Sequence, residues 1–247
     1  MGLSSWALLL STAVGASACA GGGEDGYPVR PGTGVGGGPG GGTADAGVDG
    51  RLDGGITTGR ICLASSLRTP DVCAATGAAG ISVTRGTFTV LTGADGTFLL
   101  PPATAVGNWS VSGAGLVTMV APYLAGAAVQ IPVFTTAAWD LLRRDNNMVL
   151  VDGQGSVMVS ALRPSALYKP LVVVSTDPAG VSGVYYAGDG LQIWNRDATS
   201  ALGVAVAPGL PAGTITLAGV APDASRTLPQ VPVVAGAITF VRLDFAK

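Results

Sequence analysis

The most informative absence in this chain is histidine, because its 247 residues contain none. Without histidine the chain can form neither a Ser-His-Asp nor a Cys-His catalytic arrangement, nor a histidine-ligated metal site. The commonest general base near neutral pH is also missing. Paired carboxylates could act without histidine, but no pair of acidic residues stands out in the sequence. We therefore expect that the chain is not an enzyme and has no catalytic residues, bound metal or cofactor.

Charged residues are also scarce, at 11% of the chain, which is under half the usual fraction of about 25%. Glutamate occurs only at Glu24, and lysine only at Lys169 and Lys247. Helix surfaces normally carry many charged residues, so this shortage favours β structure. The net charge is −2 and no basic cluster is present, so we expect no nucleic-acid partner.

Residues 1–18 have the pattern of a secretory signal peptide. The apolar run Trp6–Val14 is too short to span a bilayer, and small residues follow it. The string Ala16-Ser17-Ala18-Cys19 resembles the lipobox of bacterial lipoproteins, although Leu usually stands at the place of Ala16. The resemblance implies that Cys19 is lipidated, that the membrane is a partner through this anchor, and that the protein reaches the outer membrane. The alternative is plain cleavage after Ala18 and a secreted protein.

If Cys19 carries lipid, the two cysteines left over are Cys62 and Cys73. Exported proteins favour paired cysteines, and an oxidising compartment allows a disulfide. A short loop closed in this way would stabilise the fold by about 3 kcal/mol. Two unpaired, buried thiols are the alternative.

Residues 19–59 are dominated by glycine. Such a segment can bury little apolar surface, so we expect a disordered tether between the anchor and the fold. Asp45, Asp49 and Asp53 recur at every fourth position. A calcium-binding repeat would need a surrounding coil that fixes its ligands, so a solvated acidic spacer is expected instead.

From about residue 60 the pattern becomes that of β-strands. Residues 81–91 alternate around a turn at Gly86, and the phrase GADGTFLLPP (93–102) contains Asp95-Gly96, a strong hairpin signal. We expect Asp95 to shape this turn and to take no part in chemistry. Further strands are expected over residues 97–100, 108–113 and 124–134.

The same order of segments recurs later in the chain. Residues 202–213 parallel 96–107, residues 214–219 parallel 108–113, and residues 234–245 parallel 124–134. The sequence therefore predicts an all-β protein with two related sandwich modules, over 60–134 and 148–247. A helix over 135–147 should join them, capped by Thr136 and docked through Trp139, Leu141 and Leu142.

Two motifs resemble the carboxypeptidase regulatory-like family. The first module has Gly80–Val83 and Thr92–Pro101, and the second has Leu210–Thr216; each module carries half of the family pattern. The resemblance implies transthyretin-like, seven-stranded sandwiches in which the Asp-Gly step supports a turn and the following aromatic residue packs between the sheets. It implies no catalytic residues.

Three aromatic residues form the candidate ligand site: Tyr185, Tyr186 and Trp194, on an expected hairpin around Asp189-Gly190. Aromatic rings on a loop can stack on sugars, but they can equally belong to the core. Asp177, Asp189 and Asp197 could bind calcium, but satisfying turn amides is the commoner role. Related sandwiches sometimes join a lysine to an asparagine, but for Lys169 no such cross-link is expected, because the folded part lacks glutamate.

Together these features predict a non-catalytic, lipid-anchored cell-envelope protein with a structural, adhesive or assembly role. Its expected partners are the membrane and envelope proteins or glycans. The alternative is a surface or secreted module that binds a glycan or peptide through its loop aromatics.

Overall fold

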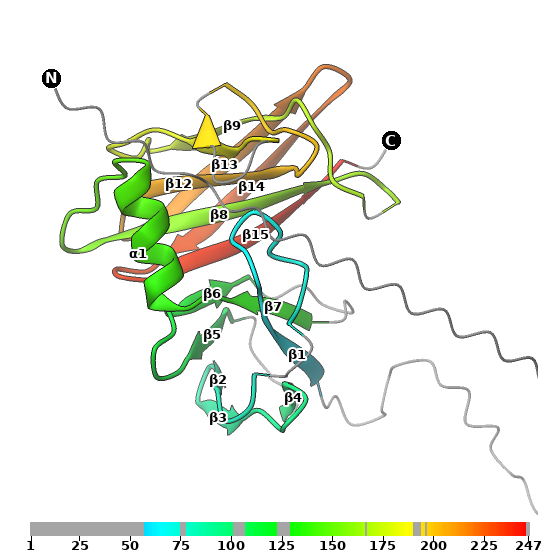
Figure 1. Cartoon of the computed structure of the whole chain (residues 1–247), viewed down its shortest axis with the longest axis vertical. Helices are drawn as coiled ribbons and strands as arrows, with labels where there is room; N and C mark the ends of the chain where they lie inside the picture. Colours follow the sequence, from blue (N-terminus) through cyan, green and yellow to red (C-terminus); the bar gives the residue numbers. More distant parts are fainter. Residues whose placement is uncertain are drawn as a thin grey trace, which may run out of the picture. The chain divides into compact units, whose positions relative to one another are not determined.

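The structure is a computed structural model that describes residues 57–74, 78–100, 107–122, 129–165, 167–189, 194–195 and 197–245. The predicted signal peptide over 1–18, Cys19 and nearly all of the predicted tether over 19–59 lie outside these residues. The described part contains strands β1 to β15 and one helix, α1 (Figure 1). The prediction of an all-β fold is confirmed.

The first block consists of seven strands in two sheets. They are β1 (Thr57–Leu63), β2 (Ser82–Arg85), β3 (Phe88–Leu91), β4 (Thr97–Leu100), β5 (Trp109–Ser112), β6 (Met119–Ala121) and β7 (Val129–Val133). One sheet has the order β4-β1-β7, and the first and last of these seven strands, β1 and β7, pair in parallel. The other sheet of this block contains β6, β5, β2 and β3, and each of these strands is antiparallel to the next.

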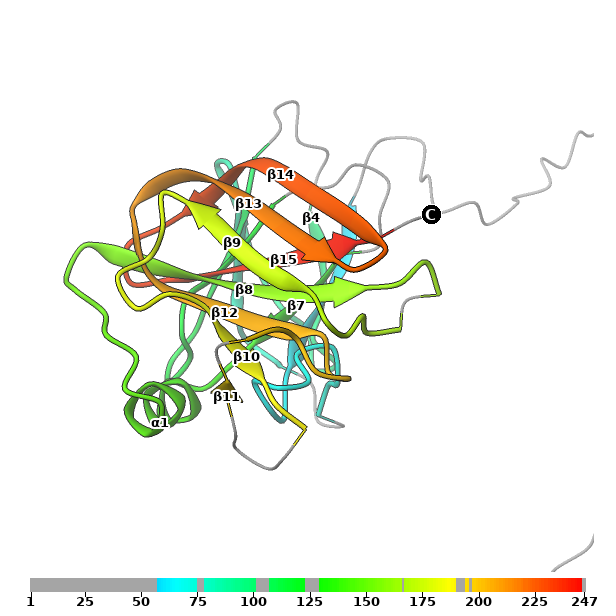
Figure 2. The same cartoon turned by 90° about the horizontal axis from the view of Figure 1, so that it is seen from above.

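The second block repeats this scheme after the helix. Its strands are β8 (Gln154–Leu162), β9 (Val173–Asp177), β10 (Tyr185–Ala187), β11 (Trp194–Asn195), β12 (Val204–Pro211), β13 (Gly213–Ala221), β14 (Ala224–Val233) and β15 (Ile238–Asp244). Here β12, β8 and β15 correspond to β4, β1 and β7, and again the first and last strands are parallel. The sheet β9-β13-β14 corresponds to β2-β5-β6 and forms a separate layer beside β8, β12 and β15 (Figure 2).

One sheet passes from the first block into the second. The last strand, β15, pairs in parallel with β6 through Ile238↔Met119 and Thr239↔Val120. This contact joins the two sets of strands into a single sheet of nine, in the order β11-β10-β12-β8-β15-β6-β5-β2-β3. The two blocks therefore share hydrogen bonds of one ladder, which the sequence did not predict.

The shared sheet separates two cores. On β15, Ile238 and Phe240 face the first core, whereas Val241 and Leu243 face the second. Because a strand sends successive side chains to opposite faces, such a strand is buried on both sides. This accounts for the nearly unbroken burial of β8, from Gly155 to Leu162.

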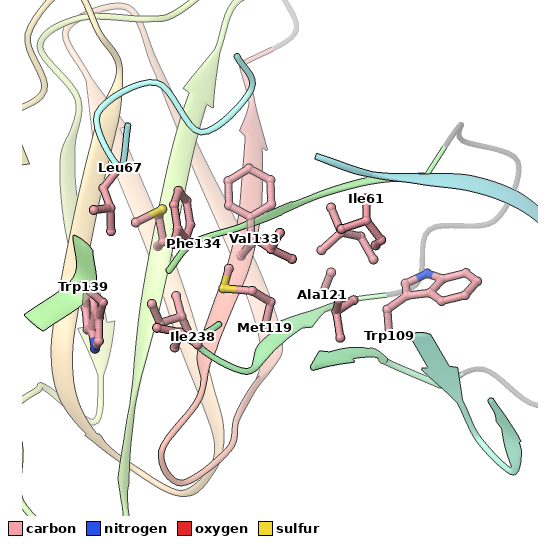
Figure 3. Close-up of a cluster of buried hydrophobic side chains, with 14 of the residues drawn as sticks. Ile61, Leu67, Trp109, Met119, Ala121, Val133, Phe134, Trp139 and Ile238 are labelled. Atoms are coloured by element: carbon pink, nitrogen blue, oxygen red, sulfur yellow. The ribbon is translucent and has the colours of Figure 1, made fainter. Parts of the chain in front are cut away.

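The first core runs from the first block to the helix. Figure 3 shows Ile61 and Trp109 towards one end of this cluster and Leu67 and Trp139 towards the other. Phe98, the aromatic residue of the family-like motif, packs against Trp109 with ring centroids 5.4 Å apart. It is buried between the two sheets of the first block, as the resemblance implies.

Helix α1 (Thr136–Asp145) covers part of the first core. Its N-cap is Thr135, whose side chain accepts a hydrogen bond from the backbone N–H of Ala138, so the expectation of a cap at Thr136 is wrong by one residue. Trp139 and Leu142 are buried as expected, but Leu141 is 43% exposed because it lies on the outer side of the helix.

The turn at Asp95-Gly96 links the two sheets of the first block. Strand β3 pairs with β2 and strand β4 pairs with β1, so the prediction of a hairpin at this turn is wrong. The expected role of Asp95 is confirmed: its Oδ1 accepts hydrogen bonds from the backbone N–H of Thr97 at 3.0 Å and from the Thr97 hydroxyl at 2.6 Å. These bonds lower the pKa of the exposed Asp95 carboxyl.

Candidate functional site

The three predicted aromatic residues do not form one surface. Strand β10 is antiparallel to β11, so the predicted hairpin exists, but its strand lies in the sheet between the two cores. Tyr185 faces the first core and is 3% exposed, whereas Tyr186 faces the second and is 2% exposed. The hydroxyl of Tyr186 accepts from the backbone N–H of Val174 and donates to its carbonyl. Both tyrosines are therefore structural, which corrects the expectation of a stacking platform.

Trp194 is different, because it is only partly buried and lines a hollow of about 250 Å³. The other walls come from α1 and from the loop between Cys62 and Cys73. Besides Trp194, the lining residues are Ser65, Ser66, Leu67, Arg68, Ala138, Leu141, Leu142, Asp145 and Asn146. The hollow thus combines an indole with hydroxyl, amide, carboxylate and guanidinium groups.

The loop from Cys62 to Cys73, here called the disulfide loop, is closed by a bond between these two residues. The predicted pairing is thus present in the structure. Cys62 lies on β1, and the loop returns to it through a β-bridge between Ala64 and Cys73. The loop therefore starts and ends beside the C-terminal end of β1.

The disulfide loop also binds the second block. The Nη2 atom of Arg242, on β15, lies 2.6 Å from Oδ1 of Asp71, and the hydroxyl of Tyr168 donates to the other carboxylate oxygen at 3.2 Å. Arg68 donates from Nη2 to the carbonyl oxygen of Gly188, just after β10. Burial, together with the negative charge of Asp71, raises the pKa of Tyr168 to about 12.

Of the three aspartates considered for calcium, Asp177 ends strand β9, and the other two take part in loop hydrogen bonds. The carboxylate of Asp189 accepts from the backbone N–H of Ala201 at 3.3 Å, and the N–H of Asp197 donates to the side chain of Asn195. Within the described ranges, no group of three or more Asp, Glu, Cys or His side chains is placed to hold a metal ion.

Lys169 is buried and its Nζ lies 2.8 Å from Oδ1 of Asp223, in the turn between β13 and β14. The same ammonium group lies 5.4 Å from the ring centre of Phe245. The hydrogen bond from Lys169 lowers the pKa of Asp223. The lysine considered for a cross-link thus takes part in an ion pair.

A second cavity, of about 270 Å³, lies where β15 extends beyond its pairing with β6. Its walls are mainly apolar and include Trp109, Ile131, Phe240 and Leu243. Pro122, which follows β6 and lines this cavity, has no backbone N–H to donate, which accounts for the end of the ladder at this point.

Sequence reasoning had identified Trp194 but not the residues around it. Ser65, Ser66 and Arg68 come from a segment about 130 residues earlier in the chain, and no local pattern links this segment to Trp194.

Among the described residues, no helix has both the length and the apolar character of a membrane span.

No protein-family model and no curated protein matches this chain. Among solved structures, the TIE protein of Bacillus anthracis aligns at 15% identity with a TM-score of 0.24, over 78% of this chain and 34% of that one. A streptococcal ancillary pilin aligns at 13% identity and a TM-score of 0.23, over 79% of this chain and 64% of that one. This chain therefore spans less than two thirds of either protein. The shaft pilin SpaA of Lactobacillus rhamnosus GG aligns at 9% identity and a TM-score of 0.22, over 78% and 98% of the two chains. The fold is defined by the chain's own strand pairing.

Proposed function

We propose that this chain is an exported, lipid-anchored protein of the cell envelope whose folded part has a structural or adhesive role without catalysis. The observation that carries the proposal is the bond between Cys62 and Cys73. Structural disulfides persist in oxidising compartments outside the cytoplasm. This bond closes the loop that binds the second block through Asp71 and Arg242, so it is part of the architecture.

The anchor is proposed to be a lipid on Cys19, in the string Ala16-Ser17-Ala18-Cys19. A single acyl chain gives only marginal membrane binding, whereas several chains hold a protein stably. Residues 20–56 would then separate the fold from the surface of the outer membrane.

The carboxypeptidase regulatory-like resemblance is part of the proposal. Its support is that Asp95 and Phe98 occupy the structural positions that the resemblance implies, one in the turn and one between the sheets. In this proposal the two modules have no catalytic site, and their surfaces bind envelope proteins or glycans.

The test is the intact mass of the protein purified from its native host, compared with that of a Cys19→Ala variant. The expected result is a diacyl or triacyl increment on a chain that begins at Cys19, absent from the variant, together with membrane fractionation of the native protein only. A mass that matches plain cleavage after Ala18, with the protein in the medium, would overturn the anchor.

A second candidate function is a surface or secreted module that binds a glycan or peptide. The observation that favours it is the hollow beside Trp194, which joins a partly buried indole to several polar side chains. Binding by Tyr185 and Tyr186 forms no part of this candidate, because both rings are buried.

A further inference from the structure

The hollow beside Trp194 is built from three segments that lie far apart in the sequence. They are residues 65–68 of the disulfide loop, one side of α1 together with its C-cap Asn146, and Trp194 on β11. The fold thus brings together one aromatic residue and five polar ones around a space of about 250 Å³.

The apolar part of the hollow is firmly supported. Leu67 and Leu142 are 8% and 7% exposed and belong to the first core, and Trp194 packs against the same cluster. Leu141, at 43% exposure, forms an open rim. An indole held by a core on one side offers a fixed apolar surface to a ligand on the other.

The polar part includes a group that lacks a partner. Arg68 donates from Nη2 to the carbonyl oxygen of Gly188, but its Nε atom is buried and has no hydrogen-bond partner in the described part of the chain. A buried donor without an acceptor is costly and uncommon in folded proteins. Because the Nε atom is closed to solvent, a ligand oxygen in the hollow would supply that acceptor only after a shift of the Arg68 side chain.

The hollow is lined by two charged residues of opposite sign. Arg68 contributes one positive charge and Asp145 one negative charge, and the Asp145 carboxylate already accepts from Nε of Arg144 at 3.2 Å. Ser65, Ser66 and Asn146 add neutral groups that can both donate and accept. Such a lining suits an uncharged ligand that carries several hydroxyl groups.

We propose that this hollow binds a single neutral sugar ring of a glycan, with the C–H face of the ring on Trp194 and its hydroxyls on the polar groups of the disulfide loop and α1. A pyranose offers one apolar face and a rim of donors and acceptors, which matches both parts of the lining. This inference gives the ligand class for the second candidate function and rests on it, but it is independent of the anchor at Cys19.

The disulfide bond has a positioning role in this site. Ser65, Ser66 and Arg68 lie inside the loop that the bond closes. Reduction removes the covalent closure of the loop and leaves it held by contacts such as those of Asp71 with Arg242 and of Arg68 with Gly188, so its polar wall should be fixed less firmly relative to Trp194. Sugar binding should therefore weaken on reduction, even under conditions where the fold persists.

The experiment is saturation-transfer-difference NMR on the full mature chain, with the methyl glycosides of glucose, galactose, mannose and N-acetylglucosamine at millimolar concentration. We expect saturation transfer to the ring C–H protons of at least one of the four. Trp194→Ala should abolish it, Trp194→Phe should retain part of it, and Arg68→Gln should weaken binding at least fivefold. Near-UV circular dichroism of each variant checks that the fold is intact.

The matched control is Phe88→Ala, which removes an aromatic side chain that is 44% exposed on β3 and does not line the hollow. Its saturation transfer should equal that of the parent chain. Absence of transfer to all four glycosides would overturn the inference, and so would transfer that survives in a folded Trp194→Ala variant.

The two proposals fail separately. A protein that is lipidated at Cys19 but transfers no saturation to any glycoside would keep the anchored structural role and lose the sugar site. A protein that binds a glycoside but has the mass of plain cleavage would keep the sugar site and lose the anchor.

Discussion

Asp71 and Arg242 stand 171 positions apart in the sequence, yet a carboxylate oxygen of the first lies 2.6 Å from Nη2 of the second. Their side chains are 23% and 33% exposed, and the Tyr168 hydroxyl donates to the same carboxylate. The disulfide loop is thereby fixed to β15 and to the segment that follows β8. These two residues form a polar link between the two blocks.

Asp71→Asn should lower the free energy of unfolding by about 2 kcal/mol. The reason is that a hydrogen bond between charged groups contributes about 1.5–3 kcal/mol, and the remaining guanidinium is partly buried. Urea denaturation measures the change. The control is Asp140→Asn, which breaks the exposed contact with Arg143 at 3.3 Å and should cost under about 0.5 kcal/mol. Equal losses in the two variants would contradict the assigned role of Asp71.

Replacing both cysteines of the disulfide loop should destabilise the chain by about 3 kcal/mol, because the unfolded chain regains the freedom that a loop of this length had lost. The cysteines are 11 positions apart. The measurement is the urea midpoint of Cys62→Ser/Cys73→Ser against the oxidised parent. Reductant should bring the parent close to the variant and leave the variant unchanged; a parent insensitive to reductant would count against the prediction.

Gly96→Ala should be more destabilising than Gly86→Ala, although both glycines have positive φ angles, of +80° and +60°. A left-handed backbone costs a non-glycine residue roughly 1–2 kcal/mol. At Gly96 the new Cβ would also lie 2.5 Å from the carbonyl oxygen of Ile61, whereas at Gly86 nothing lies within 4 Å. Thermal unfolding of the two variants tests this comparison. A similar loss at both sites would show that backbone conformation alone sets the cost.

Alkaline pH should destabilise the fold through Tyr168. Its pKa is about 12 in the folded chain against 10.0 for the free side chain, so the folded state favours the neutral phenol. The stabilisation is complete below pH 10 and is lost as the pH rises towards 12. We expect the urea midpoint to fall over this range, and to fall less steeply in Tyr168→Phe.

Tyr186 supplies the internal control for that experiment, because burial also raises the pKa of its hydroxyl. The Tyr168→Phe variant should therefore keep a residual loss of stability at alkaline pH. If its pH profile matched that of the parent, the ionisation of Tyr168 would not be linked to folding.

The sequence allowed the all-β class and the repeated order of segments to be predicted, because these depend on local patterns. Strands β4 and β5 alternate between more and less buried positions, and so does β13, the counterpart of β5 in the second block. The helix was also predictable, since Trp139 and Leu142 lie on one side of it, although its cap is Thr135 and not Thr136.

What could not be predicted are the features that arise from tertiary contacts. Strand β8 is buried from Gly155 to Leu162 without alternation, because both of its faces meet a core. Strand β10 belongs to the same sheet between the two cores, which is why both Tyr185 and Tyr186 are buried. The pairing of β15 with β6 consists of two residue pairs whose partners lie far apart in the sequence.

The candidate site was predictable only at Trp194. The hollow needs the disulfide loop and α1 to meet β11, and nothing near Trp194 in the sequence signals either one. The bond between Cys62 and Cys73 followed from counting cysteines, but its consequence for the position of Arg68 required the fold.

In each block the first and last strands lie side by side and run in the same direction, as β1 does with β7 and β8 with β15. When the ends of such a block are pulled apart, the paired strands must slide along each other. Their hydrogen bonds then carry the load in shear and break together, whereas an antiparallel hairpin pulled at its open end loses them one by one. Tension along this chain would thus meet two shear-loaded ladders in series, a mechanical resistance that would serve a protein held at one end on a cell surface.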